Sequence, residues 1–243
     1  KQAFHGRSGY TLSLTNTSDP RKTMFFPKFN WPRVDNPKLS FPITEKTLES
    51  VISSENQSIN QIKDAFVKNK NDIAAIIIEP IQGEGGDNHF RTEFIKSLYD
   101  ICYEEEALLI FDEVQTGVGI TGKMWAHEHF LINNEIIKPD ILSFGKKSQV
   151  CGILAGNRIL EVEDNVFKES SRINSTFGGN LVDMVRFKII LETIKKFSLL
   201  KNVQECGAFL FDKIQYLESS FPGFVSNSRG LGLFSAFDLP SST

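Results

Sequence analysis

The sequence predicts an α/β fold in which a mostly parallel sheet is flanked by helices. Residues 108–111 and 141–144 are short apolar runs, each bounded by polar residues, with a helix-length segment between them. A third run, residues 72–79, is stopped by Pro80. Strands that are buried on both faces of a parallel sheet are apolar runs of this length, and proline ends a strand because it cannot donate to the sheet.

Helices are predicted between and after these runs. Apolar residues recur at helical spacing over residues 58–70 and over 92–105, where Thr92 can act as an N-cap. Residues 181–197 are apolar on most sides, which indicates a long buried helix, and residues 203–221 carry the stripe of an amphipathic helix.

The residues that can carry chemistry follow two of the predicted strands. Asp112 ends the first run, and Lys146 follows the second. Because ligands of open α/β sheets bind beyond the carboxyl ends of the strands, these two side chains are expected to face one ligand. A desolvated lysine can form a Schiff base with an aldehyde, and a carboxylate favours the protonated form of a ring nitrogen. Pyridoxal 5'-phosphate (PLP) needs both groups. The pattern alone equally allows an ordinary strand end and a solvated loop lysine.

Composition excludes several classes of protein. With 27 Lys and Arg against 30 Asp and Glu, the net charge of −3 provides no basic surface for nucleic acid or an acidic membrane. No apolar run is long enough to span a bilayer, and no signal peptide opens the chain. The three cysteines show no paired spacing, which favours a reducing, cytoplasmic location over a disulfide framework.

Three further stretches each suggest a binding site that other features of the sequence argue against. Residues 21–33 interleave basic and aromatic side chains, as single-strand nucleic-acid platforms do, but the balanced charge argues for an extended loop held by its aromatics. His127 and His129 are two apart and do not share a helix face, so they are expected on a helix surface and no metal site is predicted. The Gly83 to Gly86 turn is not a Walker loop, because no Gly-Lys-Ser/Thr follows it.

The motifs resemble those of class III aminotransferases, which are PLP enzymes of fold type I. FHGRSGY, IIIEPIQGEGG, LLIFDEVQTGVGITG, PDILSFGKKSQVCG and NSTFGGN occur in the order that this family uses, over nearly the whole chain. The resemblance implies PLP as cofactor and a homodimer with shared active sites. Family members are nearly twice as long, which implies that residues 1–225 form an incomplete PLP-binding large domain and 226–243 the start of a small domain. A chain of this extent is expected to be inactive on its own.

The resemblance also implies roles for individual residues around the cofactor. Lys146, directly after Gly145, would form the Schiff base in preference to Lys147, and Asp112 would hold the ring nitrogen. The other implied contacts are Phe4 and Val114 on the two ring faces, His5 on the Phe4 loop, Gln115 at the ring hydroxyl, and Ser175 and Thr176 at the phosphate of the other subunit's cofactor.

The substrate contacts follow the branch of the family that acts on basic amino acids. Arg7 would bind the α-carboxylate of L-lysine beside Phe4, so that the terminal amine reaches the cofactor. Glu84 would mask an arginine outside this chain while lysine is bound, and is therefore expected to have no partner here. The implied reaction transfers the ε-amine of L-lysine to 2-oxoglutarate, giving 2-aminoadipate 6-semialdehyde and glutamate. Ornithine or 4-aminobutyrate as donor, or a catalytically silent fragment, remain the alternatives.

Overall fold

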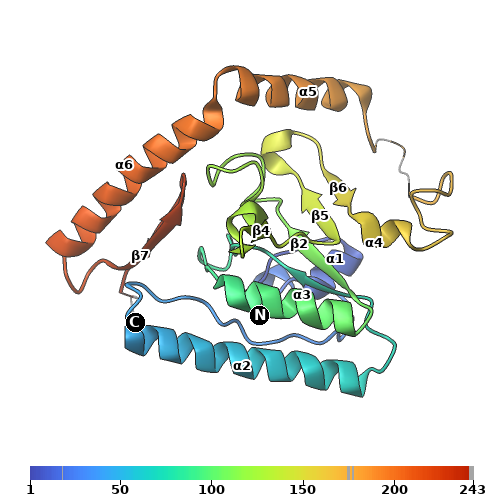
Figure 1. Cartoon of the computed structure of the whole chain (residues 1–243), viewed down its shortest axis with the longest axis horizontal. Helices are drawn as coiled ribbons and strands as arrows, with labels where there is room; N and C mark the ends of the chain where they lie inside the picture. Colours follow the sequence, from blue (N-terminus) through green and yellow to red (C-terminus); the bar gives the residue numbers. More distant parts are fainter. Residues whose placement is uncertain (18, 174–175, 177, 241–243) are drawn as a thin grey trace.

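The computed structural model describes residues 1–17, 19–173, 176 and 178–240. At its centre is a four-stranded sheet with the order β1-β2-β5-β6 (Figure 1). Strands β1, β2 and β5 are parallel, and β6 closes the edge antiparallel to β5. The predicted α/β fold with a mostly parallel sheet is confirmed. The strands are β1 (Ala75–Ile78), β2 (Leu108–Asp112), β5 (Ile141–Phe144) and β6 (Gly152–Ala155).

The apolar pattern explains why these strands form the core. Leu109 and Phe111 of β2 are fully buried, because β2 has neighbours on both sides and helix α3 on one face. The register places Ile78 opposite Phe111, and Asp112 opposite Ser143 of β5. The carboxyl ends of the three parallel strands therefore lie at one edge of the sheet.

Two helices cover one face of the sheet in successive layers. Helix α3 (Thr92–Glu104) packs against β1 and β2, and α2 (Glu45–Lys68) packs on α3 (Figure 1). The side chains that α3 buries include the predicted apolar stripe: Phe94, Ile95, Leu98, Ile101 and Cys102. Two boundaries differ from the prediction. Helix α2 begins much earlier, at the Thr44 N-cap, and Thr92 is the first helical residue, after Arg91 at the N-cap.

The segment between β2 and β5 is not the helix that its length predicts. It consists of turns, a 3-10 helix η2 (Ala126–His129) and a short hairpin of β3 (Leu131–Ile132) and β4 (Glu135–Ile136). His127 and His129 both belong to η2, but they are half-buried and do not lie on an exposed helix surface. His127 Nδ1 lies 2.8 Å from Glu113 Oε1, and His129 Nε2 lies 3.2 Å from the Thr121 hydroxyl. Within the described ranges, no group of three or more His, Cys, Asp or Glu side chains could hold a metal ion.

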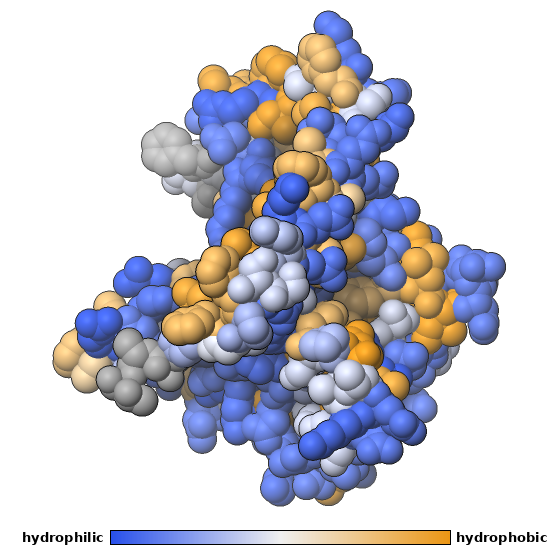
Figure 2. All heavy atoms as spheres, turned by 90° about the vertical axis from the view of Figure 1, so that its left-hand side faces the viewer, coloured by the Kyte–Doolittle hydropathy of each residue, from blue (hydrophilic) through white to orange (hydrophobic). Residues whose placement is uncertain are grey.

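Helices α5 (Leu181–Lys196) and α6 (Leu199–Ser220) form an arm that stands away from the sheet (Figure 1). The prediction of a buried helix over 181–197 is wrong in its burial, since no residue of α5 is buried. Leu181 and Val182 are 81% and 64% exposed. Figure 2 shows apolar side chains on the upper part of the arm that α5 and α6 form. The spacing of apolar residues predicts that a helix forms, but it does not predict which other part of the protein packs on that helix.

A hairpin of β7 (Ser226–Leu231) and β8 (Phe234–Asp238) packs against α6. The contact is close because Gly207 of α6 has no side chain: an added Cβ would lie 2.4 Å from the carbonyl carbon of Gly232. The short elements are α1 (Gly9–Leu14), η1 (Pro20–Lys22), η3 (Lys146–Ser148) and α4 (Asn157–Leu160).

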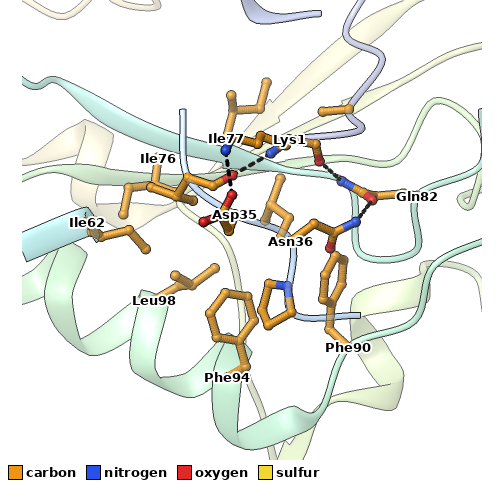
Figure 3. Close-up of a pocket in the computed structure, with 14 residues that line it drawn as sticks. Lys1, Asp35, Asn36, Ile62, Ile76, Ile77, Gln82, Phe90, Phe94 and Leu98 are labelled. Carbon is orange, nitrogen blue, oxygen red and sulfur yellow. Dashed lines mark hydrogen bonds and ion pairs between the residues drawn. The ribbon is translucent and has the colours of Figure 1, made fainter. Parts of the chain in front are cut away.

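A small cavity lies beneath β1, between the sheet, α2, α3 and residues 34–37 (Figure 3). Its volume is about 70 Å³, and Ile62, Ile76, Phe94 and Leu98 form much of its wall. Cofactor sites usually enclose about 300–1,000 Å³, so this cavity belongs to the core. No helix in the part of the chain that the structure describes has the length and apolarity to cross a membrane.

Candidate active site

Polar side chains follow all three parallel strands at the same sheet edge. Glu79 follows β1, Asp112 ends β2, and Lys146 comes two residues after β5. Register brings the last two together, since Asp112 pairs with Ser143 on the adjacent strand. This is the position at which α/β sheets bind ligands, as the sequence predicts.

Asp112 is buried and surrounded by donors. His5 Nδ1 lies 2.8 Å from its Oδ2, while Oδ1 accepts the Val114 N–H and the Ser143 hydroxyl, each at 3.1 Å. Burial alone would raise the pKa of Asp112, but the hydrogen bond and charge of His5, with the other two donors, outweigh it and hold the pKa below its ordinary value. Asp112 is therefore ionised at neutral pH, and its acceptor-only oxygens require the proton of His5 to be on Nδ1.

Val114 lies beyond the end of β2. Strand β2 ends at Asp112, and the Val114 N–H turns back to the Asp112 carboxylate. The side chain is nevertheless beside the start of η3, because an added Cβ at Gly145 would lie 3.5 Å from Val114 Cγ1.

The two lysines of η3 have different surroundings. Lys146 is exposed, and its backbone is left-handed with φ of 53°, a conformation that costs on the order of 1 kcal/mol outside glycine. Lys147 is half-buried and donates to the carbonyl oxygen of Gln115. Burial, and next the charge of Lys146, lower the pKa of Lys147. Both lysines belong to the 3-10 helix η3, which gives their side chains these different surroundings.

The loop of residues 4–7 is tied to the sheet edge through Glu79. The N–H of Phe4 donates to Glu79 Oε1 at 2.8 Å, and the N–H of Gly83 donates to Oε2 at 3.1 Å. Burial raises the pKa of Glu79, although both N–H groups oppose the shift. Gly6 has φ of 110°, which suits glycine, whereas Gly9 is simply the first residue of α1 and has free space around it.

The Gly83 to Gly86 turn packs against Gln115, and the buried Arg229 holds it from the interior of the protein. An added Cβ at Gly83 would overlap the amide end of Gln115, so a larger residue there would displace the Gln115 side chain. Arg229, 5% exposed, donates to the carbonyl oxygens of Gly86 and Asp87 and pairs with Asp238 at 2.9 Å. Arg229, in the β7–β8 hairpin, therefore contacts the turn that follows β1.

Glu84 does have a partner in this chain, contrary to the prediction. Its Oε1 accepts from Lys22 Nζ and from the Thr17 hydroxyl, the latter at 3.0 Å. Lys22 belongs to the 3-10 helix η1, although the sequence predicts an extended loop over residues 21–33. Two aromatics of that loop do hold it, since Phe29 and Trp31 stack with Tyr10 of α1 at ring-centroid distances of 5.3 and 6.3 Å, whereas Phe25 is 80% exposed. The Phe29 N–H and Arg33 also donate to Ser13.

Some of the predicted site residues do not belong to this cluster. Arg7 is exposed at the start of α1, and Thr176 is exposed. Ser175 lies outside the described residues. Sequence reasoning did not single out Glu79, Arg229 as a turn clamp, or Lys22. Only Glu79 had a recognisable signal, since it directly follows an apolar run.

The residues at this edge fit PLP by their chemistry. A buried, ionised carboxylate suits a protonated ring nitrogen, and the Lys146 amine, two residues after the adjacent strand, is of the chemical type that an aldehyde needs. Lys146 is exposed, whereas the sequence predicts a desolvated lysine at this position. His5 and the Val114 N–H contact Asp112 itself. The Phe4 N–H is held by Glu79, and Gln115 lies against Gly83.

Fold and site together define a class of protein. A family model described as aminotransferase class-III matches residues 1–243, and the chain belongs to that family, whose members depend on PLP. The resemblance predicted from the motifs is confirmed.

Three individual proteins show which members of the family this chain resembles. An L-lysine-epsilon aminotransferase from Amycolatopsis lactamdurans is 49% identical over 240 residues, which are 99% of this chain and 52% of the relative. A 4-aminobutyrate aminotransferase from Emericella nidulans is 37% identical, with 47% of it covered. The solved lysine aminotransferase from M. tuberculosis superposes with a TM-score of 0.93 at 49% identity, over 99% of this chain and 53% of that one. The chain spans about half the length of the curated relatives it matches.

Proposed function

We propose that this chain is the cofactor-binding part of a lysine 6-aminotransferase, which transfers the ε-amine of L-lysine to 2-oxoglutarate. The observation that carries the proposal is the buried, ionised Asp112 one strand away from the exposed Lys146. The higher identity to lysine-specific relatives than to 4-aminobutyrate enzymes supports this donor.

The residues divide the chemistry as follows. PLP, when bound, supplies an aldehyde and a ring that takes up electrons from the substrate carbon. Asp112, kept ionised by His5, would favour the protonated form of the ring nitrogen. The Lys146 amine removes a proton from the substrate carbon and returns it to a different atom, as a general acid and base.

The surrounding residues orient the reactants. Phe4 and Val114 would hold the cofactor ring between them, and Gln115 would hydrogen-bond the ring hydroxyl. Arg7 binds the substrate α-carboxylate through its planar fork, which leaves the ε-amine to react. While L-lysine is bound, Glu84 masks an arginine outside this chain that 2-oxoglutarate would otherwise use.

A homodimer in the cytoplasm completes the proposal. Ser175 and Thr176 would then contact the phosphate of the partner subunit's cofactor, and the exposed Thr176 is compatible with that contact. All three cysteines are free, as a reducing compartment favours. Residues 1–225 and 226–243 would belong to the large and small domains respectively.

Borohydride reduction of the complete protein with PLP, followed by peptide mapping, tests the cofactor site. A pyridoxyl group is expected on Lys146; a group on Lys147, or none, contradicts the assignment. Turnover with L-lysine, L-ornithine and 4-aminobutyrate then tests the donor. Preference for ornithine or 4-aminobutyrate would leave the class intact and overturn the substrate.

A further inference from the structure

A second cavity, larger than the one in the core, lies within the segment of residues 15–33. Its volume is about 320 Å³, inside the range of about 300–1,000 Å³ that ligand sites usually enclose. All of the described residues that line it belong to this one segment. None of them is a residue to which the proposed function assigns a role, so the cavity is separate from the proposed contacts with cofactor and substrate.

The walls of this cavity provide hydrogen-bond donors and positive charge. Lys28 and Arg33 contribute an ammonium and a guanidinium group, and no carboxylate occurs among the described lining residues. Hydroxyls and amides complete the polar lining, with Thr17, Thr23, Asn16 and Asn30 among them. A concave surface with two cations and no acid attracts anions, because the field of one sign is not cancelled locally.

Arg33 has a donor that the protein itself does not satisfy. One terminal nitrogen of its guanidinium donates to the carbonyl oxygen of Ser13. Its Nε is buried and has no hydrogen-bond partner among the described residues. Leaving a buried charged donor without an acceptor is costly. Because Arg33 lines the cavity, an oxyanion bound there can supply the missing acceptor.

The carboxylates next to this segment are engaged elsewhere. Asp19 pairs with Nε of Arg21 at 2.9 Å. Glu84 accepts the Thr17 hydroxyl at 3.0 Å, but it forms its ion pair with Lys22. Neither carboxylate therefore neutralises the two cations of the cavity.

The shape of the segment is fixed before any ligand binds. The rings of Phe29 and Trp31 stack at a centroid distance of 5.0 Å, and both stack with Tyr10 of α1. The Phe29 N–H also donates to the Ser13 hydroxyl at 2.9 Å. A preformed site binds its ligand more tightly, because little conformational freedom is lost on binding.

We propose that this cavity is a binding site for an oxyanion, the phosphate or carboxylate group of a small molecule, which Arg33 and Lys28 hold by charge-assisted hydrogen bonds. The site does not depend on the aminotransferase reaction, since it shares no residue with the proposed chemistry.

Calorimetry of the complete, PLP-loaded protein with inorganic phosphate tests the site. Bound PLP already occupies its own phosphate position, so phosphate cannot bind there. Saturable binding of one phosphate per chain is expected, and it should weaken as sodium chloride is added. Malonate is titrated in parallel, and the tighter of the two anions shows whether the ligand class is phosphate esters or carboxylates.

Two variants and a matched control assign the binding to this cavity. Lys28→Met should weaken binding of the tighter anion roughly fivefold, as loss of an exposed charge does, and should leave the fold intact. Arg33→Met should weaken it roughly tenfold or more, because a charge-assisted hydrogen bond is lost. Arg21→Met is the control, since Arg21 belongs to the same segment but pairs with Asp19 and does not line the cavity.

The Lys28 variant keeps the test decisive even if loss of the Arg33 bond to Ser13 impairs folding. The proposal is overturned if neither anion binds saturably. It is also overturned if Lys28→Met binds both anions as tightly as Arg21→Met does, because the binding would then take place elsewhere on the protein.

Discussion

Nδ1 of His5 lies 2.8 Å from Oδ2 of Asp112, although the two residues are 107 positions apart in the chain. This contact joins the N-terminal loop to the end of β2 and provides the donor that most lowers the pKa of a carboxyl group which burial would otherwise raise. It is a relationship that stability measurements can test without assaying turnover.

Replacing His5 with Gln should destabilise the fold in a pH-dependent way. The pKa of Asp112 is lowered in the folded state, so its bonds stabilise the protein above the ordinary pKa of 3.8 and stop doing so as pH falls through the lower folded value. His5→Gln should therefore cost about 1–3 kcal/mol near pH 7, and the difference should shrink below pH 3.8. Chemical denaturation across pH measures this. A cost that is independent of pH, or equally large with Asp112→Asn, would contradict the linkage.

Asp112→Asn should retain PLP and lose most turnover. The amide keeps the size of the side chain but removes the charge that holds a proton on the ring nitrogen. We expect a fall of roughly a hundredfold or more in kcat, the size typical of losing one electrostatic contact in an active site. Absorbance of the bound cofactor and stopped-flow half-reactions measure the two properties separately, and near-normal turnover would refute the role of Asp112.

Substitution of Lys146 and substitution of Lys147 should have opposite effects on stability and on attachment of the cofactor. Lys147→Met removes a bond to the Gln115 carbonyl oxygen and should cost about 1 kcal/mol of stability while the cofactor stays reducible onto the protein. Lys146→Met should leave the free energy of unfolding nearly unchanged, because Lys146 is exposed, and should abolish the reducible adduct. The reverse pattern would transfer the reactive role to Lys147.

Arg229→Met should destabilise the protein by about 2–4 kcal/mol, since it leaves the carbonyl oxygens of Gly86 and Asp87 without their buried donor. Because that turn carries Glu84, KM for the substrates should change as well. Arg186→Met is the control: Arg186 forms an exposed pair with Asp183, and its loss should alter stability by less than about 0.5 kcal/mol. Equal effects of the two variants would show that the clamp contributes nothing.

Local pattern in the sequence determined the central strands and the edge at which the chemistry lies. Residues 108–112 and 141–144 are apolar runs with polar ends, and parallel strands bring their carboxyl ends together, so Asp112 and Lys146 could be predicted as neighbours. The motifs around them were enough to identify the family, which the family match confirms.

Tertiary structure alone decided which partners those residues have. His5 with Asp112, Lys22 with Glu84, and Arg229 with the Gly86 carbonyl join positions that are 62 to 143 residues apart, and no spacing in the sequence encodes such pairs. The same limit explains α5, whose apolar pattern predicted burial that the described chain does not provide. Hydrophobic periodicity is a property of a few consecutive residues, whereas contacts and burial depend on which distant surfaces the folded chain brings together.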